Sequence, residues 1–206
     1  MHDDAIAGLI LAGGLSSRMG GGDKSLLELN GKPVLHHIIG RIGPQVATLA
    51  LNANGQVDRF AAFGLPVLPD TVPGFPGPLA GVLAGLEWVE AQPSHRTLMT
   101  VAGDTPFLPC DLAARLSDAT RNDPQAIAVA GSCGREHPVF ALWPAGISAP
   151  LRAYLHEGGR KVFDFVRSRP IVSVNFDCAR GIDPFFNINT PEDLAEAQRL
   201  MSGDRK

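Results

Sequence analysis

The sequence predicts an α/β fold with a mainly parallel central sheet. Short apolar runs alternate with segments whose apolar residues recur at helical spacing, the pattern of strands joined by crossover helices. A glycine-rich loop directly follows the first apolar run, and polar residues stand where later runs end. In an open parallel sheet these ends meet at one edge, where ligands bind. Both features therefore predict a ligand site at that edge.

The apolar runs and helical patterns define the expected elements in order. The expected strands of the first two thirds of the chain are Ile6 to Leu11, Val46 to Leu51, Val67 to Leu68, Thr97 to Ala102 and Ala126 to Ala130. The expected helices there are Val34 to Ile42, Val57 to Phe63, Leu79 to Glu90 and one that opens at Cys110 and Asp111. In the third of these helices, apolar residues recur on one stripe, which makes it the best defined of the set.

The last third of the chain is less regular. Its expected strands are Pro138 to Trp143 and Ile171 to Phe176, and its expected short helices are Leu151 to Leu155 and Val162 to Val166. A final helix is signalled by Thr190, a good N-cap residue, and by Pro191 at the first helical position.

Composition limits the function classes. The chain has 206 residues, 45% of them hydrophobic, so one domain can bury a sizeable core. Its formal net charge of −3 gives no basic excess, so we expect no nucleic-acid partner. No run of about 18 apolar residues occurs, so we expect no membrane span. The three cysteines are far apart and odd in number, and the start is acidic, which favours a reduced cytoplasmic protein.

The glycine-rich loop, Leu11 to Lys24, is the main candidate for chemistry. Its glycines allow tight turns, and unpaired backbone N–H groups in such a loop form an anion-binding concavity. Arg18 offers a planar fork for phosphate oxygens, and Lys24 offers a mobile charge. The loop is not a Walker A motif, because Asp23 rather than glycine precedes Lys24, and it lacks the dinucleotide fingerprint. A flexible surface loop with solvated charges remains the alternative.

Three polar residues follow apolar runs and should share the sheet edge: Asn52, Asp70 and Asp104. An amide at position 52 can both donate and accept, and carboxylates at the other two can accept from a base or ribose, or hold Mg²⁺. Each also has a plainer interpretation. Asn52 can be a turn residue, Asp70 a loop charge without a ligand, and Asp104 an Asx-turn residue before Pro106.

The pattern Leu-Ala-Gly-Gly-x-Ser-x-Arg-Met-Gly-x-x-x-Lys, at Leu11 to Lys24, resembles the signature loop of the nucleotidyltransferases that build NDP-sugars. Its version with Met19-Gly20-Gly21 and Asp23-Lys24 is similar to that of the molybdenum cofactor guanylyltransferases. The likeness continues in Asp70 followed by Gly77 to Gly81, in Gly103 to Phe107, and in Phe186 to Leu194. It covers most of the chain.

The resemblance implies a Rossmann-like three-layer nucleotidyltransferase fold that transfers GMP from GTP to the terminal phosphate of molybdopterin (Mo-molybdopterin), with Mg²⁺ as cofactor. It implies catalytic roles for Lys24, Arg18 and Asp104, the last of which holds the metal. The residues it implies for nucleotide binding are Leu11, Ala12, Gly13, Lys24, Asn52, Asp70 and Asp104.

Asn187 and Asn189 are implied on the acceptor side. They alternate on a strand-like stretch and should share a face, although Asn residues that satisfy a turn remain the alternative. We predict one domain over residues 1–206, with a nucleotide-binding part at about 1–105 and an acceptor-binding part at about 106–200. Molybdopterin-delivering proteins and apo-molybdoenzymes are possible partners.

Three rival functions stay open at this point. The same machinery could serve another nucleotide or acceptor, as in a cytidylyl or sugar-phosphate transferase. The chain could be a non-catalytic nucleotide-binding module, against which the presence of both Lys24 and Asp104 argues. It could also deliver cofactor to apo-enzymes.

Overall fold

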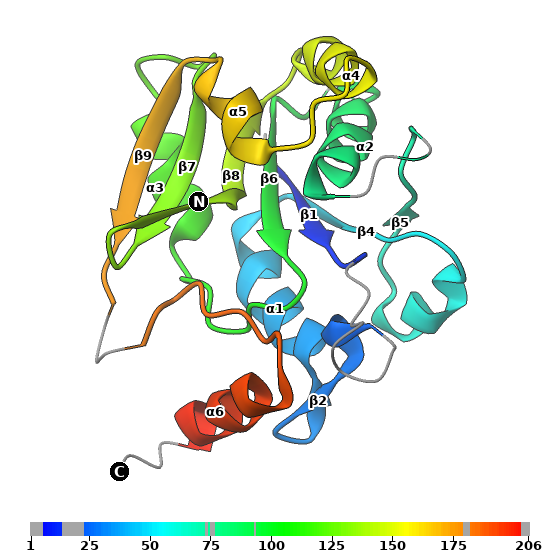
Figure 1. Ribbon diagram of the computed structural model, residues 1–206, viewed down its shortest axis with the longest axis vertical. Helices are drawn as coiled ribbons and strands as arrows, with labels where there is room; N and C mark the ends of the chain where they lie inside the picture. Colours follow the sequence, from blue (N-terminus) through cyan, green and yellow to red (C-terminus); the bar gives the residue numbers. More distant parts are fainter. Residues whose placement is uncertain are drawn as a thin grey trace.

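A seven-stranded sheet in the order β5-β4-β1-β6-β8-β7-β9 forms the centre of the structure (Figure 1). The structure is a computed structural model that describes residues 6–13, 23–72, 74, 77–92, 94–178 and 182–202. The strands are β1 (Ile6–Leu11), β4 (Thr48–Asn52), β5 (Val67–Leu68), β6 (Thr97–Ala102), β7 (Ile127–Ser132), β8 (Arg135–Pro144) and β9 (Ile171–Phe176). β5, β4, β1 and β6 pair in parallel, as do β7 and β9, whereas β8 runs antiparallel to both neighbours. The predicted, mainly parallel sheet is confirmed.

Helices cover both faces of this sheet. The helices are α1 (Val34–Ile42), α2 (Pro78–Glu90), α3 (Leu112–Ala119), α4 (Ser148–His156), α5 (Val162–Arg167) and α6 (Pro191–Ser202). Side chains of β1 alternate between the two faces: Ile6 and Ile10 join one core with α1 and α3, and Ala7 and Leu9 join the other with α2, α4 and α5. This is the three-layer arrangement that the family resemblance implies.

A small hairpin and three 3₁₀ helices add detail that the sequence prediction lacked or simplified. The hairpin pairs β2 (Glu28–Leu29) with β3 (Lys32–Pro33) across Asn30 and Gly31, both with positive φ (52° and 77°). Asn-Gly is the strongest short hairpin signal, so this element was missed although its signal is present. The 3₁₀ helices are Lys24–Leu26, Gly43–Gln45 and Val57–Phe63, the last of which was expected as a brief helix.

The approach to α6 differs in one respect from the prediction. The Thr190 hydroxyl accepts the N–H of Asp193 at 3.1 Å, and Asp193 Oδ2 accepts the N–H of Thr190 at 2.9 Å, so the predicted N-cap is confirmed. Asn187 and Asn189, however, lie on irregular backbone rather than on a strand. Their shared face therefore cannot come from strand alternation, and the prediction of a strand-like stretch was wrong.

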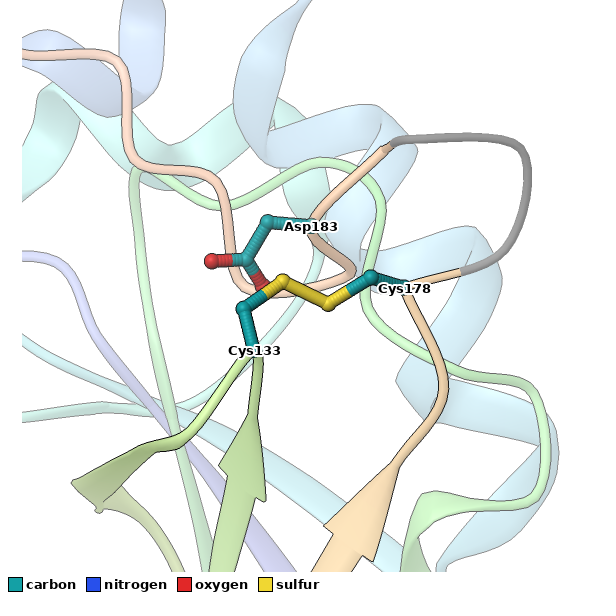
Figure 2. A group of neighbouring side chains, drawn as sticks. All are labelled: Cys133, Cys178 and Asp183. Atoms are coloured by element: carbon teal, nitrogen blue, oxygen red, sulfur yellow. A yellow bond between two sulfur atoms is a disulfide. The ribbon is translucent and has the colours of Figure 1, made fainter.

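Two of the three cysteines pair. Cys133, in the turn between β7 and β8, forms a disulfide with Cys178, just beyond β9, with a Cα–Cα distance of 6.0 Å (Figure 2). Cys110 is free and exposed. The expectation of reduced cysteines was wrong for this pair, because 45 residues separate its members and only the parallel pairing of β7 with β9 brings them together.

Among the described residues, no helix combines the length and the apolar character that crossing a membrane requires.

Candidate active site

The carboxyl ends of β1, β4, β5 and β6 converge on a cavity of about 520 Å³. In Figure 1 the arrowheads of β1 and β6 point toward this end of the molecule, where α6 and β2 lie. The chain runs from β1 to β4 and β5 on one side of β1, and then crosses to β6 on the other side. The cavity therefore lies at the switch point of the sheet, where α/β folds bind ligands. Predicted site residues that line the cavity are Leu11, Ala12, Gly13, Lys24, Asn52, Asp70, Asp104 and Asn187.

The glycine-rich loop is described only at its two ends, residues 11–13 and Asp23 onward. Arg18, one of the predicted catalytic residues, lies outside the described residues. At the first end, Ala12 donates its N–H to the carbonyl of Asn52 at 2.9 Å, and the carbonyl of Leu11 accepts from Gly103 at 3.0 Å. Because these backbone groups already form hydrogen bonds within the protein, Leu11 and Ala12 contribute to the site by forming part of the cavity wall.

Gly103 is required at this junction. A Cβ at that position would lie 2.9 Å from the carbonyl oxygen of Leu11 and 3.0 Å from the Cα of Ala12, both backbone atoms. Only glycine allows the chain after β6 to approach the chain after β1 this closely. The close approach puts Asp104 beside the loop.

Lys24 meets two of the predicted site residues. Its Nζ donates to Asn189 Oδ1 at 2.5 Å and lies 3.7 Å from Asp104 Oδ2. Burial raises the pKa of the Asp104 carboxyl, and the charge of Lys24 only partly opposes this effect. The carboxylate is therefore incompletely compensated, and a further cation beside it would stabilise its charged form.

The segment before α6 is tied to the end of β6. Ile188 donates its N–H to the carbonyl of Asp104 at 2.9 Å, and the Thr105 hydroxyl donates to Asn187 Oδ1 at 2.5 Å. Thr105 is fully buried. Of the two predicted acceptor-side residues, Asn187 lines the cavity, and Asn189 contacts the cavity residue Lys24.

Asn52 and Asp70 form a second pair at the other side of the cavity. The Nδ2 group of Asn52 donates to the carbonyl of Leu68 at 3.0 Å and to Asp70 Oδ1 at 2.9 Å. Both amide hydrogens are then used, so Asn52 can meet a ligand only as an acceptor, through Oδ1. The sequence-based expectation that it both donates and accepts at the ligand was too broad; its donors hold Asp70.

Gly81 in α2 makes room for this pair. A Cβ at Gly81 would overlap the side-chain amide of Asn52 and would come within 2.8 Å of Leu11 Cδ2. Gly81, the last residue of the Gly77 to Gly81 motif, therefore lets α2 pass directly over Asn52.

The sequence analysis did not predict two polar side chains of the cavity lining as site residues. Asn54 contacts Asp70, and Ser25 follows Lys24 directly. Ser25 is 2% exposed, and no described residue gives its hydroxyl a hydrogen-bond partner. Both could have been found from their positions in the sequence, because Asn54 lies two residues after Asn52 and Ser25 follows Lys24 directly.

A larger cavity of about 600 Å³ lies at the opposite edge of the sheet. It is lined by Ile6 and Thr97, where β1 and β6 begin, and its charged side chains include Asp118 and Arg121, which pair with each other at 2.5 Å. Size therefore does not identify the site. We assign the site to the smaller cavity, because the switch point and the Lys24–Asp104 pair coincide there.

A hydrogen-bonded Ser–His–Asp cluster lies outside the cavity lining. The Ser132 hydroxyl donates to Asp183 Oδ1 at 2.6 Å and contacts His137 Nε2 at 2.8 Å. With its single proton given to Asp183, Ser132 must accept from His137, whose Nε2 then carries the hydrogen. His137 is not placed to take a proton from Ser132, so the cluster has the wrong order for a serine nucleophile.

One group of three potential metal ligands occurs in the described part of the chain: Cys133, Cys178 and Asp183. Figure 2 shows the Asp183 carboxylate beside the disulfide that joins the two sulfurs. These sulfurs belong to a covalent bond, and Mg²⁺ prefers oxygen ligands. Asp104 is the better candidate for Mg²⁺, which commonly takes one or two carboxylates together with phosphate oxygens and water.

Comparison with known proteins settles the family. A family model described as the MobA-like NTP transferase domain matches residues 8–171. The chain belongs to this family. A relative from Mesorhizobium japonicum, named molybdenum cofactor guanylyltransferase, is 56% identical over 199 residues, covering 95% of this chain and 96% of the relative. A relative of the same name from Rhodopseudomonas palustris is 51% identical over 204 residues, covering 98% and 97%.

Solved structures agree on the MobA-like fold. The crystal structure of molybdopterin-guanine dinucleotide biosynthesis protein A from Archaeoglobus fulgidus matches with a TM-score of 0.78 at 20% identity, over 96% of this chain and 99% of that one. A CMP:2-keto-3-deoxy-manno-octonic acid synthetase complexed with CTP matches with a TM-score of 0.74 at 16% identity, over 98% and 100%. The expected nucleotidyltransferase fold is thereby confirmed, and the chain is a nucleotidyltransferase by family.

Proposed function

We propose that this MobA-like protein transfers GMP from GTP to the terminal phosphate of molybdopterin (Mo-molybdopterin). The products are the guanine dinucleotide form of the molybdenum cofactor and pyrophosphate. The observation that carries the proposal is the Lys24–Asp104 pair at the switch point of the sheet, with the Asn52–Asp70 pair across the same cavity. The names of the relatives supply the nucleotide and the acceptor.

The reaction is an attack by a phosphate oxygen of molybdopterin on the α-phosphorus of GTP, which expels pyrophosphate. A phosphate monoester is an anion at neutral pH, so the attack needs no protein nucleophile and no strong general base. The arrangement of Ser132, His137 and Asp183, which provides neither, is compatible with this chemistry. Positioning and charge stabilisation then account for the rate.

Each site residue has a role in that scheme. Lys24 stabilises negative charge on the phosphates, with help from Arg18. Leu11, Ala12 and Gly13 form the wall against which the triphosphate lies. The Asp70 carboxylate, held by Asn52, accepts from the guanine N1–H and N2–H₂ groups or from a ribose hydroxyl.

We propose that Asp104 holds Mg²⁺. The incompletely compensated carboxylate fits a divalent cation with a preference for oxygen ligands. When bound, Mg²⁺ neutralises charge on the phosphate oxygens. Asn187, which lines the cavity, and Asn189, which contacts Lys24, orient the acceptor phosphate through their amide groups. We propose a cytoplasmic location on the basis of the proposed GTP donor, with molybdopterin-delivering proteins and apo-molybdoenzymes as partners.

The proposal is tested with a nucleotide panel and an acceptor. Binding of GTP, CTP, ATP and UTP is measured with and without Mg²⁺, and pyrophosphate release is then followed with and without molybdopterin. We expect GTP-selective binding and acceptor-dependent release, with Asp104→Asn shifting the Mg²⁺ requirement to higher concentration. Selective turnover of CTP would indicate a cytidylyltransferase instead, and GTP binding without turnover would indicate a non-catalytic module.

A further inference from the structure

Asn54, in the segment between β4 and β5, holds Asp70 by a two-point contact with its carboxylate and its backbone N–H. Asn54 Nδ2 donates to Asp70 Oδ2 at 2.8 Å, and the N–H of Asp70 donates to Asn54 Oδ1 at 2.9 Å. Asn52 already donates to the other carboxylate oxygen, Oδ1, at 2.9 Å. One amide hydrogen on each oxygen fixes the plane of the carboxylate, and about two lone-pair positions remain for a ligand.

Arg59 links this arrangement to the phosphate side of the cavity. Its Nη2 donates to the carbonyl of Asn54 at 3.0 Å, and its Nε forms an ion pair with Asp23, whose side chain is only 7% exposed. Asp23 immediately precedes Lys24. The guanidinium also lies 4.5 Å from the ring centroid of Phe60, a fully buried residue, so a rigid surface supports it.

We infer that Asn54 and Arg59 are positioning residues of the nucleotide site, with different tasks. Asn54 sets the orientation of the Asp70 carboxylate and thereby the selectivity for the donor groups of the nucleoside. Arg59 holds Asn54 and Asp23, the residue before Lys24, at a fixed separation. One nucleotide can then contact Asp70 and Lys24 at the same time. The inference rests on the proposed function, because it takes Asp70 as the residue that reads the nucleoside.

A purely structural role makes a different prediction. If Asn54 only closed the turn after β4, its loss would lower stability but would affect all nucleotides alike. If it orients Asp70, its loss must act on the nucleotide groups that Asp70 contacts. Nucleotides that lack one donor separate the two roles: ITP lacks the guanine 2-amino group, and 2′-deoxyGTP lacks the ribose 2′-hydroxyl.

The experiment measures kcat/KM for GTP, ITP and 2′-deoxyGTP with the full-length protein, Mg²⁺ and molybdopterin. We expect the wild type to prefer GTP over at least one analogue, and Asn54→Ala to reduce that preference by on the order of tenfold, the loss of about one hydrogen bond to a charged group. Gln45→Ala is the matched control. The Gln45 amide also bridges two segments, through the carbonyls of Arg41 and Pro109, but at the opposite edge of the sheet. It should leave the ratios unchanged.

Arg59 is tested by the same assay. Arg59→Ala should remain folded by circular dichroism and still lower kcat/KM for all three nucleotides by a similar factor. The ratios between nucleotides should persist, because Asp23 and Asn54 are no longer held at a fixed separation while the Asp70 carboxylate keeps its plane. Arg59→Lys should recover only part of the loss, since an ammonium cannot span Asp23 and the Asn54 carbonyl as a planar fork does. Wild-type activity in Arg59→Ala would overturn this half of the inference.

Failure of the inference and failure of the proposed function give separate results. A wild type that does not prefer GTP over CTP contradicts the proposed function. A wild type that prefers GTP over CTP but treats both analogues like GTP contradicts the assignment of Asp70, and with it the role of Asn54. Unchanged analogue ratios in Asn54→Ala, with wild-type discrimination intact, contradict the role of Asn54 alone.

Discussion

The amine of Lys24 lies 3.7 Å from Asp104 Oδ2, so the end of the glycine-rich loop and the end of β6 share one charge pair. The same amine donates to Asn189, which brings the segment before α6 to the pair. Three parts of the chain that are distant in sequence thus meet at one cation. Side chains of both charged partners are about one fifth exposed, which leaves them accessible to a nucleotide.

Lys24→Met is expected to abolish most turnover while the fold persists. Removing the charge takes away a group that stabilises the phosphates, and loss of one such group costs roughly 10²–10³ in rate. Methionine retains much of the length of the lysine stem, so packing around it should change little. The measurement is pyrophosphate release at saturating GTP, with circular dichroism as the control for folding. A folded variant with near-normal rates would contradict the proposed role.

Gly81→Ala is expected to weaken nucleotide binding through Asn52. The added Cβ would overlap the Asn52 amide, displace it and remove a hydrogen bond from Asp70. Gly40→Ala is a matched control, because Gly40 is an exposed helical residue whose Cβ would meet nothing within 4 Å. That change should stabilise α1 by up to about 1 kcal/mol without altering affinity. Equal GTP affinities in the two variants, measured by titration calorimetry, would show that Gly81 has no such role.

Ser25→Ala separates binding from stability. No described residue partners the buried Ser25 hydroxyl, and a buried hydroxyl without a partner costs about 1–3 kcal/mol. Its removal should therefore leave the melting temperature of the nucleotide-free protein unchanged or higher. If the hydroxyl donates to a phosphate in the bound state, the same variant should bind GTP more weakly and gain less thermal stability from saturating nucleotide. A lower melting temperature without nucleotide, together with normal GTP affinity, would instead identify Ser25 as a structural residue.

Much of the site could be predicted because each residue follows an apolar run. Asn52, Asp70 and Asp104 stand at or just after strand ends, and parallel pairing brings these ends to one edge of the sheet. That inference needs only the period of the apolar residues and the direction of the strands. Lys24 could be predicted as a site residue because the glycine-rich loop before it leaves β1 at the same edge of the sheet.

The partners of each side chain could not be predicted in the same way. Both amide hydrogens of Asn52 are donated to Leu68 and Asp70, and the sequence analysis did not single out Asn54, which donates to Asp70. These contacts depend on angles and separations of a few ångströms between segments, which periodicity does not determine. The hairpin at Asn30 and Gly31 is different, since its turn signal is present in the sequence and was overlooked.

Reduction of the Cys133–Cys178 disulfide is expected to lower stability. The bond closes a loop with a sequence separation of 45 residues, and cross-links of this kind contribute about 2–4 kcal/mol. Urea unfolding with and without dithiothreitol measures the change in the free energy of unfolding. The Cys133→Ser/Cys178→Ser double variant should match the reduced wild type and should not respond to the reductant. Cys110→Ser should behave like the wild type, because Cys110 is free.

His137 is expected to make the stability of the protein fall below about pH 6.5, its unperturbed pKa. Burial lowers the pKa of His137, an effect that Asp183 opposes and Arg135 reinforces, and the Phe185 ring lies 4.9 Å from the imidazole. As pH falls below the pKa of His137 in the unfolded chain, the unfolded chain binds a proton there while the folded protein remains unprotonated at His137. The free energy of unfolding therefore falls over that window and levels off below the folded pKa.

The variant His137→Gln isolates this contribution. Glutamine can still donate to Ser132 but carries no titratable group, so the loss of stability between pH 7.5 and pH 5.5 should be smaller than in the wild type. Urea unfolding at the two pH values measures both, and the difference between the proteins removes the contribution of the other histidines. Identical pH dependence would mean that the folded and unfolded chains hold the His137 proton equally well, which contradicts the burial argument.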